Sequence, residues 1–231
     1  MRENTSHLRP HDIPEATLRR LPVYFRCLQD MLAGGATRVS CADLGRVLGL
    51  DPTLVRKDIE MTGIVGKPRV GYLLVALVHQ IENFLGWTRP KEAVLAGAGS
   101  LGSALLGYGK FRSHGMEIVA AFDVDPEKIG RRIHDREIQP LLLLPGYARQ
   151  KQILLGVIAT PAAAAQTVAD LMVTGGISAI WNFAPAHIQT PPSVILHNED
   201  LYYSLASLSF RLESRLGTPL LENGIKYVED H

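Results

Sequence analysis

A glycine-rich stretch occupies residues 97–102, between an apolar run and a helix-like pattern. The first glycine permits a tight turn, the second lets the backbone approach phosphate groups, and the third lets the helix pack closely on the strand. Free N–H groups at the start of the helix favour a bound pyrophosphate. A helix–sheet turn without a ligand is the alternative. The residues predicted to hold the pyrophosphate are Gly97, Ala98, Gly99, Ser100, Leu101 and Gly102.

Three further segments place polar residues where the same ligand would lie. Asp123 stands 21 residues after Gly102, at the end of a strand-like run. A carboxylate there accepts hydrogen bonds from ribose hydroxyls and repels a 2′-phosphate, which favours NAD(H) over NADP(H). Thr160-Pro161 and Asn182 end the next two strand-like runs. We expect them to line the nicotinamide half, although these residue types are also common in turns.

The sequence offers no group that would carry out chemistry on such a ligand. His114, His134, His187 and His197 do not stand beside a carboxylate in a recognisable catalytic arrangement. We therefore predict no catalytic residue, no metal site and no enzyme activity. Two alternatives stay open: a small NAD-dependent oxidoreductase, and a regulator that binds another nucleotide such as CoA.

The pattern after Ala93 alternates strand-like and helix-like runs, which favours a parallel sheet with crossover helices. The first third of the chain is helical in pattern, and Pro22 predicts a kink or restart in its first helix. Ser40 and Asp51-Pro52 are signals for the starts of two short helices joined by a turn at Gly49. This arrangement predicts a helix-turn-helix, followed by a hairpin-like wing over residues 63–72.

Basic residues on these elements would suit a nucleic-acid partner. The second short helix carries Arg56 and Lys57, with Thr53 at the end that usually reaches base edges. Lys67 and Arg69 lie on the wing and could enter a minor groove. Simple solvation of a small helical domain is the alternative. The predicted DNA contacts are Ser40, Thr53, Arg56, Lys57, Lys67 and Arg69.

Composition agrees with a soluble protein of ordinary polarity. The net charge of the 231 residues is +1, with 12 basic against 9 acidic residues before residue 90 and 12 against 14 after it. No apolar run reaches the roughly 18 residues of a membrane span, and the first residues lack a secretory signal. Cys27 and Cys41 lack metal-ligand spacing and indicate free thiols in the cytoplasm.

The expected architecture is α/β with two domains. We predict a winged-helix DNA-binding domain over residues 1–86 and a Rossmann domain, a doubly wound parallel sheet, over 90–197. A C-terminal helix over 198–217 and a tail over 218–231 complete the chain.

Seven segments in order give the chain a specific resemblance. They are "IPEATLRRLPVYFRCL", "LVRKDIEMTGIVGKPRVGY", "GAGSLGSALLGY", "FDVDPEKIG", "ATPAAAAQ", "NFAP" and "NEDLYYSLASLSFRL". Over about residues 13–213 the chain resembles the Rex family of redox-sensing transcriptional repressors. The resemblance implies a homodimer with a swapped C-terminal helix, which senses the NADH/NAD⁺ ratio and leaves operator DNA when NADH binds.

The resemblance also implies residues that couple the two domains, and it has one local departure. Arg26 and Tyr108 match coupling positions, and Asp200 would join them from the partner subunit. In the wing, Pro68 stands where the family usually has arginine, and Arg69 where it has glycine. We expect the wing geometry to differ accordingly.

Overall fold

The computed structural model describes residues 13–216 and divides them into two compact units. The N-terminal unit contains residues up to Pro90 together with Lys110–Met116, and the sheet unit contains Lys91–Gly109 and the chain from Glu117 on. The predicted tail, 218–231, lies outside the described residues. The sequence placed residues 110–116 with the second domain, whereas in the structure they pack with the first. Edge-on ring contacts explain this. The ring centroid of His114 lies 4.4 Å from that of Trp87, and the ring centroid of Trp87 lies 5.1 Å from that of Phe25.

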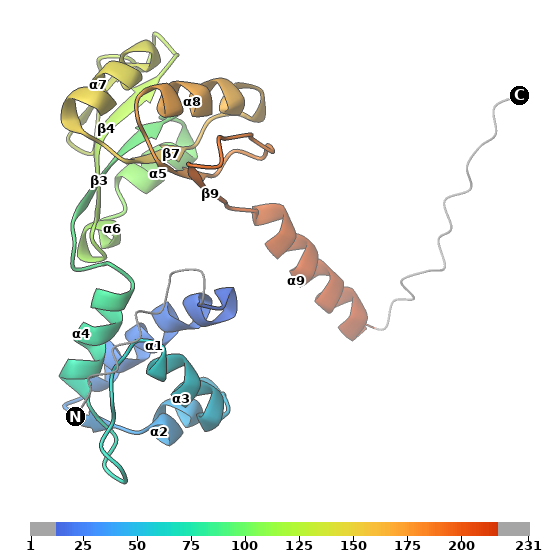
Figure 1. Cartoon of the computed structure of the whole chain (residues 1–231). Coiled ribbons are helices and arrows are strands. Elements are labelled where there is room, and N and C mark those ends of the chain that lie inside the picture. The colour runs from blue at the N-terminus through green and yellow to red at the C-terminus, as the bar shows by residue number, and fades with distance from the viewer. Residues whose placement is uncertain (1–12, 217–231) are drawn as a thin grey trace, which may run out of the picture. The chain divides into compact units, whose positions relative to one another are not determined.

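The described part of the N-terminal unit combines helices with a two-stranded sheet (Figure 1). The helices are α1 (Glu15–Ala33), α2 (Cys41–Leu48), α3 (Pro52–Glu60) and α4 (Leu74–Phe84). Strands β1 (Arg38–Val39) and β2 (Tyr72–Leu73) pair antiparallel. The short helix α6 (Lys110–Ser113) also belongs to this unit.

The predicted helix starts are confirmed for α2 and α3. Ser40 and Asp43 form a capping box, and the Asp51 carboxylate accepts the N–H groups of Thr53 and Leu54. Gly49 ends α2 with a φ of 67°, a left-handed conformation that suits glycine. At Pro22, where the sequence predicts a kink or a restart, α1 continues without a restart, and the kink stays a prediction. Buried packing of Leu21, Phe25 and Leu28 stabilises α1 enough to offset the hydrogen bond that proline removes.

A buried ionic cluster joins α3 to α1. The Asp58 carboxylate accepts two hydrogen bonds from Arg20, at 2.6 and 2.8 Å, one from Tyr24 at 2.6 Å and one from Thr17 at 2.8 Å. Burial alone would raise the pKa of Asp58, but these donors outweigh it and hold the pKa below its usual range. The carboxylate is therefore charged and saturated, and it fixes α3 against α1.

The sheet unit has seven strands in the spatial order β5-β6-β4-β3-β7-β8-β9. The strands are β3 (Lys91–Ala96), β4 (Met116–Asp123), β5 (Arg132–Ile133), β6 (Arg136–Pro140), β7 (Leu155–Ile158), β8 (Ala179–Asn182) and β9 (Ile195–Asn198). The pairs β4–β6, β3–β7, β7–β8 and β8–β9 are parallel, while β5 is antiparallel to β6. This order is that of a doubly wound dinucleotide-binding sheet with β5 added at one edge.

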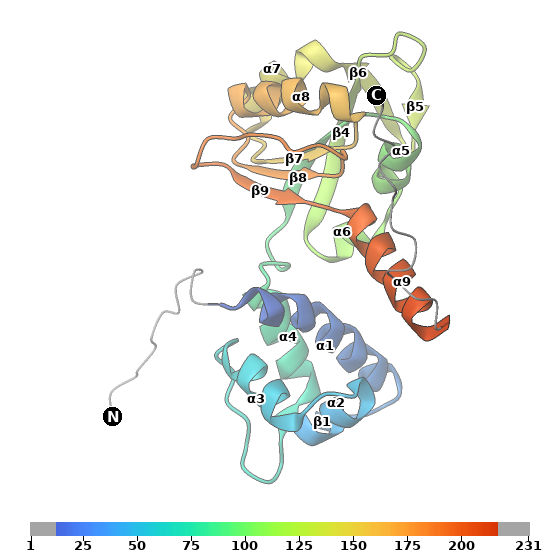
Figure 2. The same ribbon diagram turned by 90° about the vertical axis from the view of Figure 1, so that its right-hand side faces the viewer.

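Helices cover both faces of this sheet (Figures 1 and 2). Helices α7 (Leu144–Lys151) and α8 (Ala162–Thr174) pack together on one face, and α5 (Ser100–Leu106) lies on the other. A 3-10 turn, Leu141–Leu143, leads into α7. The last helix of the described residues is α9 (Leu201–Leu216). It begins three residues later than the predicted start at residue 198, because Asn198 is the last residue of β9.

Two sequence expectations on composition can be compared with the described residues. No helix there is both long enough and apolar enough to cross a membrane. Cys27 and Cys41 are free thiols, and burial raises the pKa of each.

We expect Asp58→Ala to lower the free energy of unfolding of the N-terminal unit at pH 7 by about 3 kcal/mol or more. The substitution leaves the Arg20 cation without its buried partner. Because the pKa of Asp58 is lowered in the folded state, the loss should shrink as the pH falls below about 4. Urea unfolding can be followed by Trp87 fluorescence in a Trp181→Phe background, since the chain has two tryptophans.

The matched control is Glu60→Ala, which removes an exposed carboxylate from the same helix. Its effect should stay within about 0.5 kcal/mol. Similar losses in the two variants would contradict a special role for the buried cluster.

Candidate functional site

The main candidate site lies at the carboxyl ends of β3 and β7. β3 is central in the sheet, and the strand that follows it in the chain, β4, lies on one side while β7 lies on the other. A crevice forms where the direction of winding changes in this way, and ligands of doubly wound sheets bind there. The predicted glycine loop follows β3, and the predicted Thr160-Pro161 follows β7, so the fold brings these two segments to one place.

The three glycines occupy positions where a side chain would interfere with the fold or with a ligand. Gly97 has a φ of 97°, and a Cβ there would lie 2.5 Å from the Ala159 carbonyl oxygen. A Cβ on Gly102 would overlap the carbonyl oxygen of Gly97, whereas one on Gly99 would meet nothing within 4 Å. The loop is therefore closed on the protein side and open beside Gly99, as close approach of a phosphate requires.

The N-terminal end of α5 supplies donors beside that open space. The first N–H used within the helix is that of Ser103, which donates to the Gly99 carbonyl at 2.8 Å. The N–H groups of Ser100, Leu101 and Gly102 therefore precede the first turn of hydrogen bonds, and such groups bind anions. The Ala98 N–H donates to the Asp123 carboxylate at 2.7 Å, and the predicted contact of Ala98 with the ligand stays a prediction.

Asp123 ends β4, is 7% exposed and lines the cavity. Its Oδ2 accepts the Ala98 N–H, and its Oδ1 accepts the Asp125 N–H at 2.9 Å. Burial alone would raise the pKa of Asp123, but these N–H donors and the Lys128 ammonium hold the pKa below its usual range. The sheet unit thus presents an ionised, fixed hydrogen-bond acceptor to the cavity.

The loop, Asp123 and the end of β7 enclose a cavity of about 460 Å³. Thr160 lines this cavity, and its Oγ1 is buried without a hydrogen-bond partner among the described residues. A buried hydroxyl in that state costs free energy, which a ligand that bonds to it would recover. Pro161 also lines the cavity, and it is exposed there as the residue before α8.

Asn182 is placed beneath the neighbouring loop and does not line the cavity. It is fully buried, its amide donates to the carbonyls of Ala184 and Ala186 and to Asn198, and its oxygen accepts the Ala184 N–H at 3.0 Å. We therefore assign Asn182 a positioning function for the turn that follows β8. The turn itself supplies Phe183 and Pro185, which the sequence analysis missed.

Phe183 and Pro185 also line a second cavity, of about 690 Å³, beside the N-terminal end of α9. This cavity is further lined by Asp200 and Tyr202. The two cavities are thus separated by one shared wall. Lys128 was missed as well, and it could not be found by spacing because a bend after β4 brings it back to Asp123.

The predicted DNA contacts lie at the start of α2, on α3 and on the wing of the N-terminal unit. Thr53, Arg56 and Lys57 are exposed on α3. Ser40 is committed to its capping box, where its hydroxyl donates to Asp43 at 2.6 Å and accepts the Asp43 N–H at 3.1 Å. We expect any contact of Ser40 with DNA to be secondary to this function.

The wing is a hairpin, as predicted, with reciprocal backbone bonds of 2.9 Å between Lys67 and Gly71. Val70 also donates to the Lys67 carbonyl at 3.1 Å, so Pro68 and Arg69 are the central residues of a tight turn. Arg69 has a φ of 61°, a conformation that usually favours glycine. This is the local consequence of the departure seen in the sequence, and it leaves Lys67 and Arg69 exposed.

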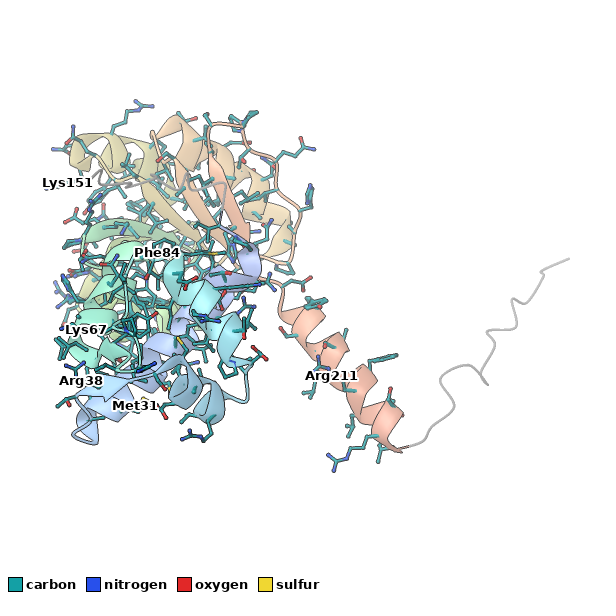
Figure 3. The ribbon with its side chains drawn as sticks, turned by 60° about the horizontal axis from the view of Figure 1, so that its bottom comes forward. Met31, Arg38, Lys67, Phe84, Lys151 and Arg211 are labelled. Atoms are coloured by element: carbon teal, nitrogen blue, oxygen red, sulfur yellow. The ribbon has the colours of Figure 1, made fainter. Side chains whose placement is uncertain are left out.

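A groove of about 880 Å³ runs between α3 and the wing and is lined by Arg56, Lys67 and Arg69. Arg38 lines the same groove, and the sequence analysis did not find it. Only the pairing of β1 with β2 brings Arg38 to the wing, and two-residue strands leave no pattern in a sequence. Figure 3 labels Arg38 and Lys67 on this unit. Asp43 and Glu60 also line the groove, so its four cations outnumber its carboxylates by two, and this excess of positive charge suits a phosphate backbone.

The predicted coupling residues are each placed within their own unit. Arg26 is exposed on α1 and lines an apolar groove with Val23 and Val47. Tyr108 is 51% exposed after α5, and the Asp200 carboxylate accepts the Tyr203 N–H at 2.9 Å at the start of α9. Their coupling stays a prediction. Among residues 13–216, no three His, Cys, Asp or Glu side chains gather as metal ligands.

We expect Gly102→Ala to lower the free energy of unfolding of the sheet unit by about 2 kcal/mol or more, because the new methyl group would overlap backbone. Gly99→Ala should cost less, about 1 kcal/mol or below, because a methyl group there meets nothing within 4 Å and only the lower preference of alanine for the N-cap position of α5 remains. Urea unfolding followed by Trp181 fluorescence in a Trp87→Phe background measures both. Equal stability of the two variants would show that the loop is not closed as described.

Comparison with known proteins supports the division into these two units. A family model described as "Putative DNA-binding protein N-terminus" matches residues 12–59, and one described as "CoA binding domain" matches residues 88–186. Among solved structures, a Rex-family repressor called RSP in complex with β-NAD⁺ and operator DNA has a TM-score of 0.84 at 32% identity, covering 88% of this chain and 94% of that chain. RSP in complex with β-NADH has a TM-score of 0.79 at 31% identity, with coverage of 88% and 96%.

Curated relatives extend over nearly the whole sequence. The redox-sensing transcriptional repressor Rex of Desulforamulus reducens is 42% identical over 200 residues, which are 87% of this chain and 95% of the relative. Rex of Pelotomaculum thermopropionicum is 43% identical over 208 residues, with coverage of 89% and 98%. Identity at this level and coverage of almost the full length show common ancestry of both units together. The chain therefore belongs to the Rex family of redox-sensing transcriptional repressors.

Proposed function

We infer that this chain represses transcription in response to the NADH/NAD⁺ ratio, with the sheet unit as sensor and the N-terminal unit as DNA reader. The strongest support for this function is that a single crevice combines three features. They are the open glycine loop, the ionised Asp123 and the Thr160 hydroxyl, which has no partner among the described residues. These groups suit a pyrophosphate, an adenosine ribose and a further polar group of a dinucleotide. The same chain carries four cations around the groove beside α3.

The residues fit the two ends of NAD(H) differently. Asp123 would accept the adenosine ribose hydroxyls, and Gly97–Gly102 would hold the pyrophosphate. The nicotinamide would then lie toward Phe183 and Pro185, the wall shared with the cavity beside the N-terminal end of α9. The nicotinamide ring is cationic in NAD⁺ and neutral in NADH. An apolar wall therefore favours the reduced form, since burial penalises charge.

Helix α9 indicates that a second copy of the chain completes the protein. Leu205, Leu208, Leu212 and Leu216 form one stripe along the helix, and each is at least 53% exposed. An isolated helix of this length is marginal in water, and an exposed apolar stripe marks an interface. We propose that this stripe packs in a homodimer, and that the two-fold symmetric dimer reads an inverted repeat in DNA. The cytoplasm, which holds both DNA and NADH, is the expected location.

The two rival functions differ in physical terms. An oxidoreductase needs an acid/base group beside the nicotinamide. The cavity beside the N-terminal end of α9 is lined by such groups, namely His187, Glu199 and Asp200, so an assay for turnover is needed to distinguish this rival. The matching model named for CoA raises the second rival. The adenosine ribose of CoA carries a 3′-phosphate, which the ionised Asp123 would repel. Calorimetry with NADH and CoA, and an assay for steady NADH oxidation with small carbonyl compounds, separate these functions.

We expect NADH to weaken binding of the protein to its DNA about 5- to 150-fold at fixed salt, the usual range of allosteric coupling. A suitable DNA is an inverted repeat selected by the protein from a random pool, and fluorescence anisotropy measures its affinity. Gly99→Ala should abolish this response and weaken NADH binding in calorimetry, because the methyl group fills the space reserved for phosphate. Its DNA affinity without NADH should match that of the wild type. DNA binding that is unchanged while NADH binds would contradict the sensor function.

We expect Leu208→Glu to convert the dimer to monomer, because it places a charge in the middle of the apolar stripe. Ser214→Glu is the matched control, since Ser214 lies on the opposite side of the same helix and is exposed. Sedimentation equilibrium distinguishes the two masses. A wild-type monomer, or a dimer that survives Leu208→Glu, would contradict this assignment of the interface.

A further inference from the structure

The ribose end of the pocket contains a cation whose function the family pattern of glycines and acid does not explain. Lys128 Nζ lies 3.3 Å from Asp123 Oδ2 and 3.3 Å from Asp125 Oδ2. Its side chain is 35% exposed and lines the same cavity as Gly97 and Thr160. Among the described residues that line this cavity, Lys128 carries the one positive charge, against the two negative charges of Asp123 and Asp125.

The hydrogen bonds of Asp123 show what a ribose would have to displace. Oδ2 already accepts the Ala98 N–H at 2.7 Å as well as Lys128, whereas Oδ1 accepts only the Asp125 N–H in the described structure, at 2.9 Å. A carboxylate oxygen has two lone pairs, so one hydroxyl can bond to Oδ1 without displacing any group. A second hydroxyl would take the place of Lys128 on Oδ2.

Lys128 can give up this bond without losing its charge pairing. Asp125 Oδ2 holds the same ammonium at 3.3 Å, and the Asp125 Oδ1 accepts the Glu127 N–H at 2.9 Å, which fixes that carboxylate. A ribose with free hydroxyls can therefore bind while Lys128 stays on Asp125. The positive charge of Lys128 therefore changes the affinity for such a ligand only a little.

A ribose with a 2′-phosphate meets a different balance of charge. Asp123 and Asp125 both repel the phosphate, and Lys128 is the cation that offsets this repulsion. Burial alone would lower the pKa of Lys128, but the two carboxylates outweigh it and hold the pKa above its usual range, so the ammonium is charged at neutral pH. The preference for NAD(H) over NADP(H) then depends on the charges of Asp123, Asp125 and Lys128, whereas the sequence pattern identifies only Asp123.

We propose that Lys128 is a specificity-determining residue. Its positive charge reduces the electrostatic repulsion that Asp123 and Asp125 exert on a 2′-phosphate. This inference rests on the proposed function, because it requires that the pocket binds NAD(H). It predicts that the wild-type protein binds NADPH weakly but measurably. It also predicts that the charge at residue 128 changes the affinity for NADPH and leaves the affinity for NADH nearly constant.

The test is calorimetry of the full chain with NADH and with NADPH at one ionic strength. Lys128→Met keeps the length and apolar stem of the side chain and removes the charge. We expect it to weaken NADPH binding at least about tenfold while NADH binding changes less than about threefold. Asp125→Asn should do the opposite and tighten NADPH binding, because it removes one repelling charge.

Lys151→Met is the matched control, since Lys151 is an exposed residue at the end of α7 in the same unit and is outside the cavity lining (Figure 3). It should leave both affinities unchanged. Equal shifts of NADH and NADPH affinity in Lys128→Met would overturn the inference, as would a wild-type protein that does not bind NADPH at millimolar concentration. Absence of NADH binding by the wild-type protein would overturn the proposed function and this inference together.

Discussion

The hydrogen bond from the Ala98 N–H to the Asp123 carboxylate is the constraint on which the ligand pocket depends. It joins the turn after β3 to the end of β4, so the phosphate loop and the ribose acceptor are held at one fixed separation. The bond is possible because Gly97 turns the chain with a positive φ and because Gly102 allows α5 to approach that turn. It also helps to keep Asp123 ionised although the side chain is buried, and in the proposed function this charge selects the ligand.

The N-terminal unit uses a buried aspartate for a different purpose. Asp58 is saturated by donors from α1, so no acceptor capacity is left for a ligand, and the carboxylate serves only to hold α3. Asp123 keeps one unused lone pair on Oδ1 among the described contacts and faces a cavity. The same residue type therefore gives a rigid anchor in one unit and a binding group in the other, and the number of donors around it decides which.

Local signals allowed much of this to be predicted from the sequence. Ser40, Gly49 and Asp51 are residues whose short-range hydrogen bonds or backbone conformation determine where helices begin and end, and all three act as expected. The glycine loop was predictable for the same reason. Pro22 does not restart the helix, because its local preference is weaker than the packing of α1 in the core.

Residues whose function depends on distant neighbours could not be found in this way. Arg38 reaches the wing only through the β1–β2 pairing. Lys128 reaches Asp123 through a bend that no residue spacing reveals. Asn182 was assigned to the ligand because strand ends gather there, but its amide is satisfied by the turn that it supports. A polar residue at a strand end is expected near the ligand. Whether its side chain is free to bind the ligand depends on how many hydrogen bonds it already makes within the protein.

The position of the shared wall limits how a redox signal could leave the pocket. Phe183 and Pro185 separate the dinucleotide cavity from the one beside the N-terminal end of α9, and Asp200 caps α9 at that end. The turn that carries this wall is fixed from below by Asn182, which also bonds to Asn198 of β9 at 2.9 Å. A displacement of the wall by the nicotinamide would therefore act on β9 and the start of α9 together. If the apolar stripe of α9 packs in a dimer, the ligand state and the quaternary arrangement are coupled through a few adjacent residues.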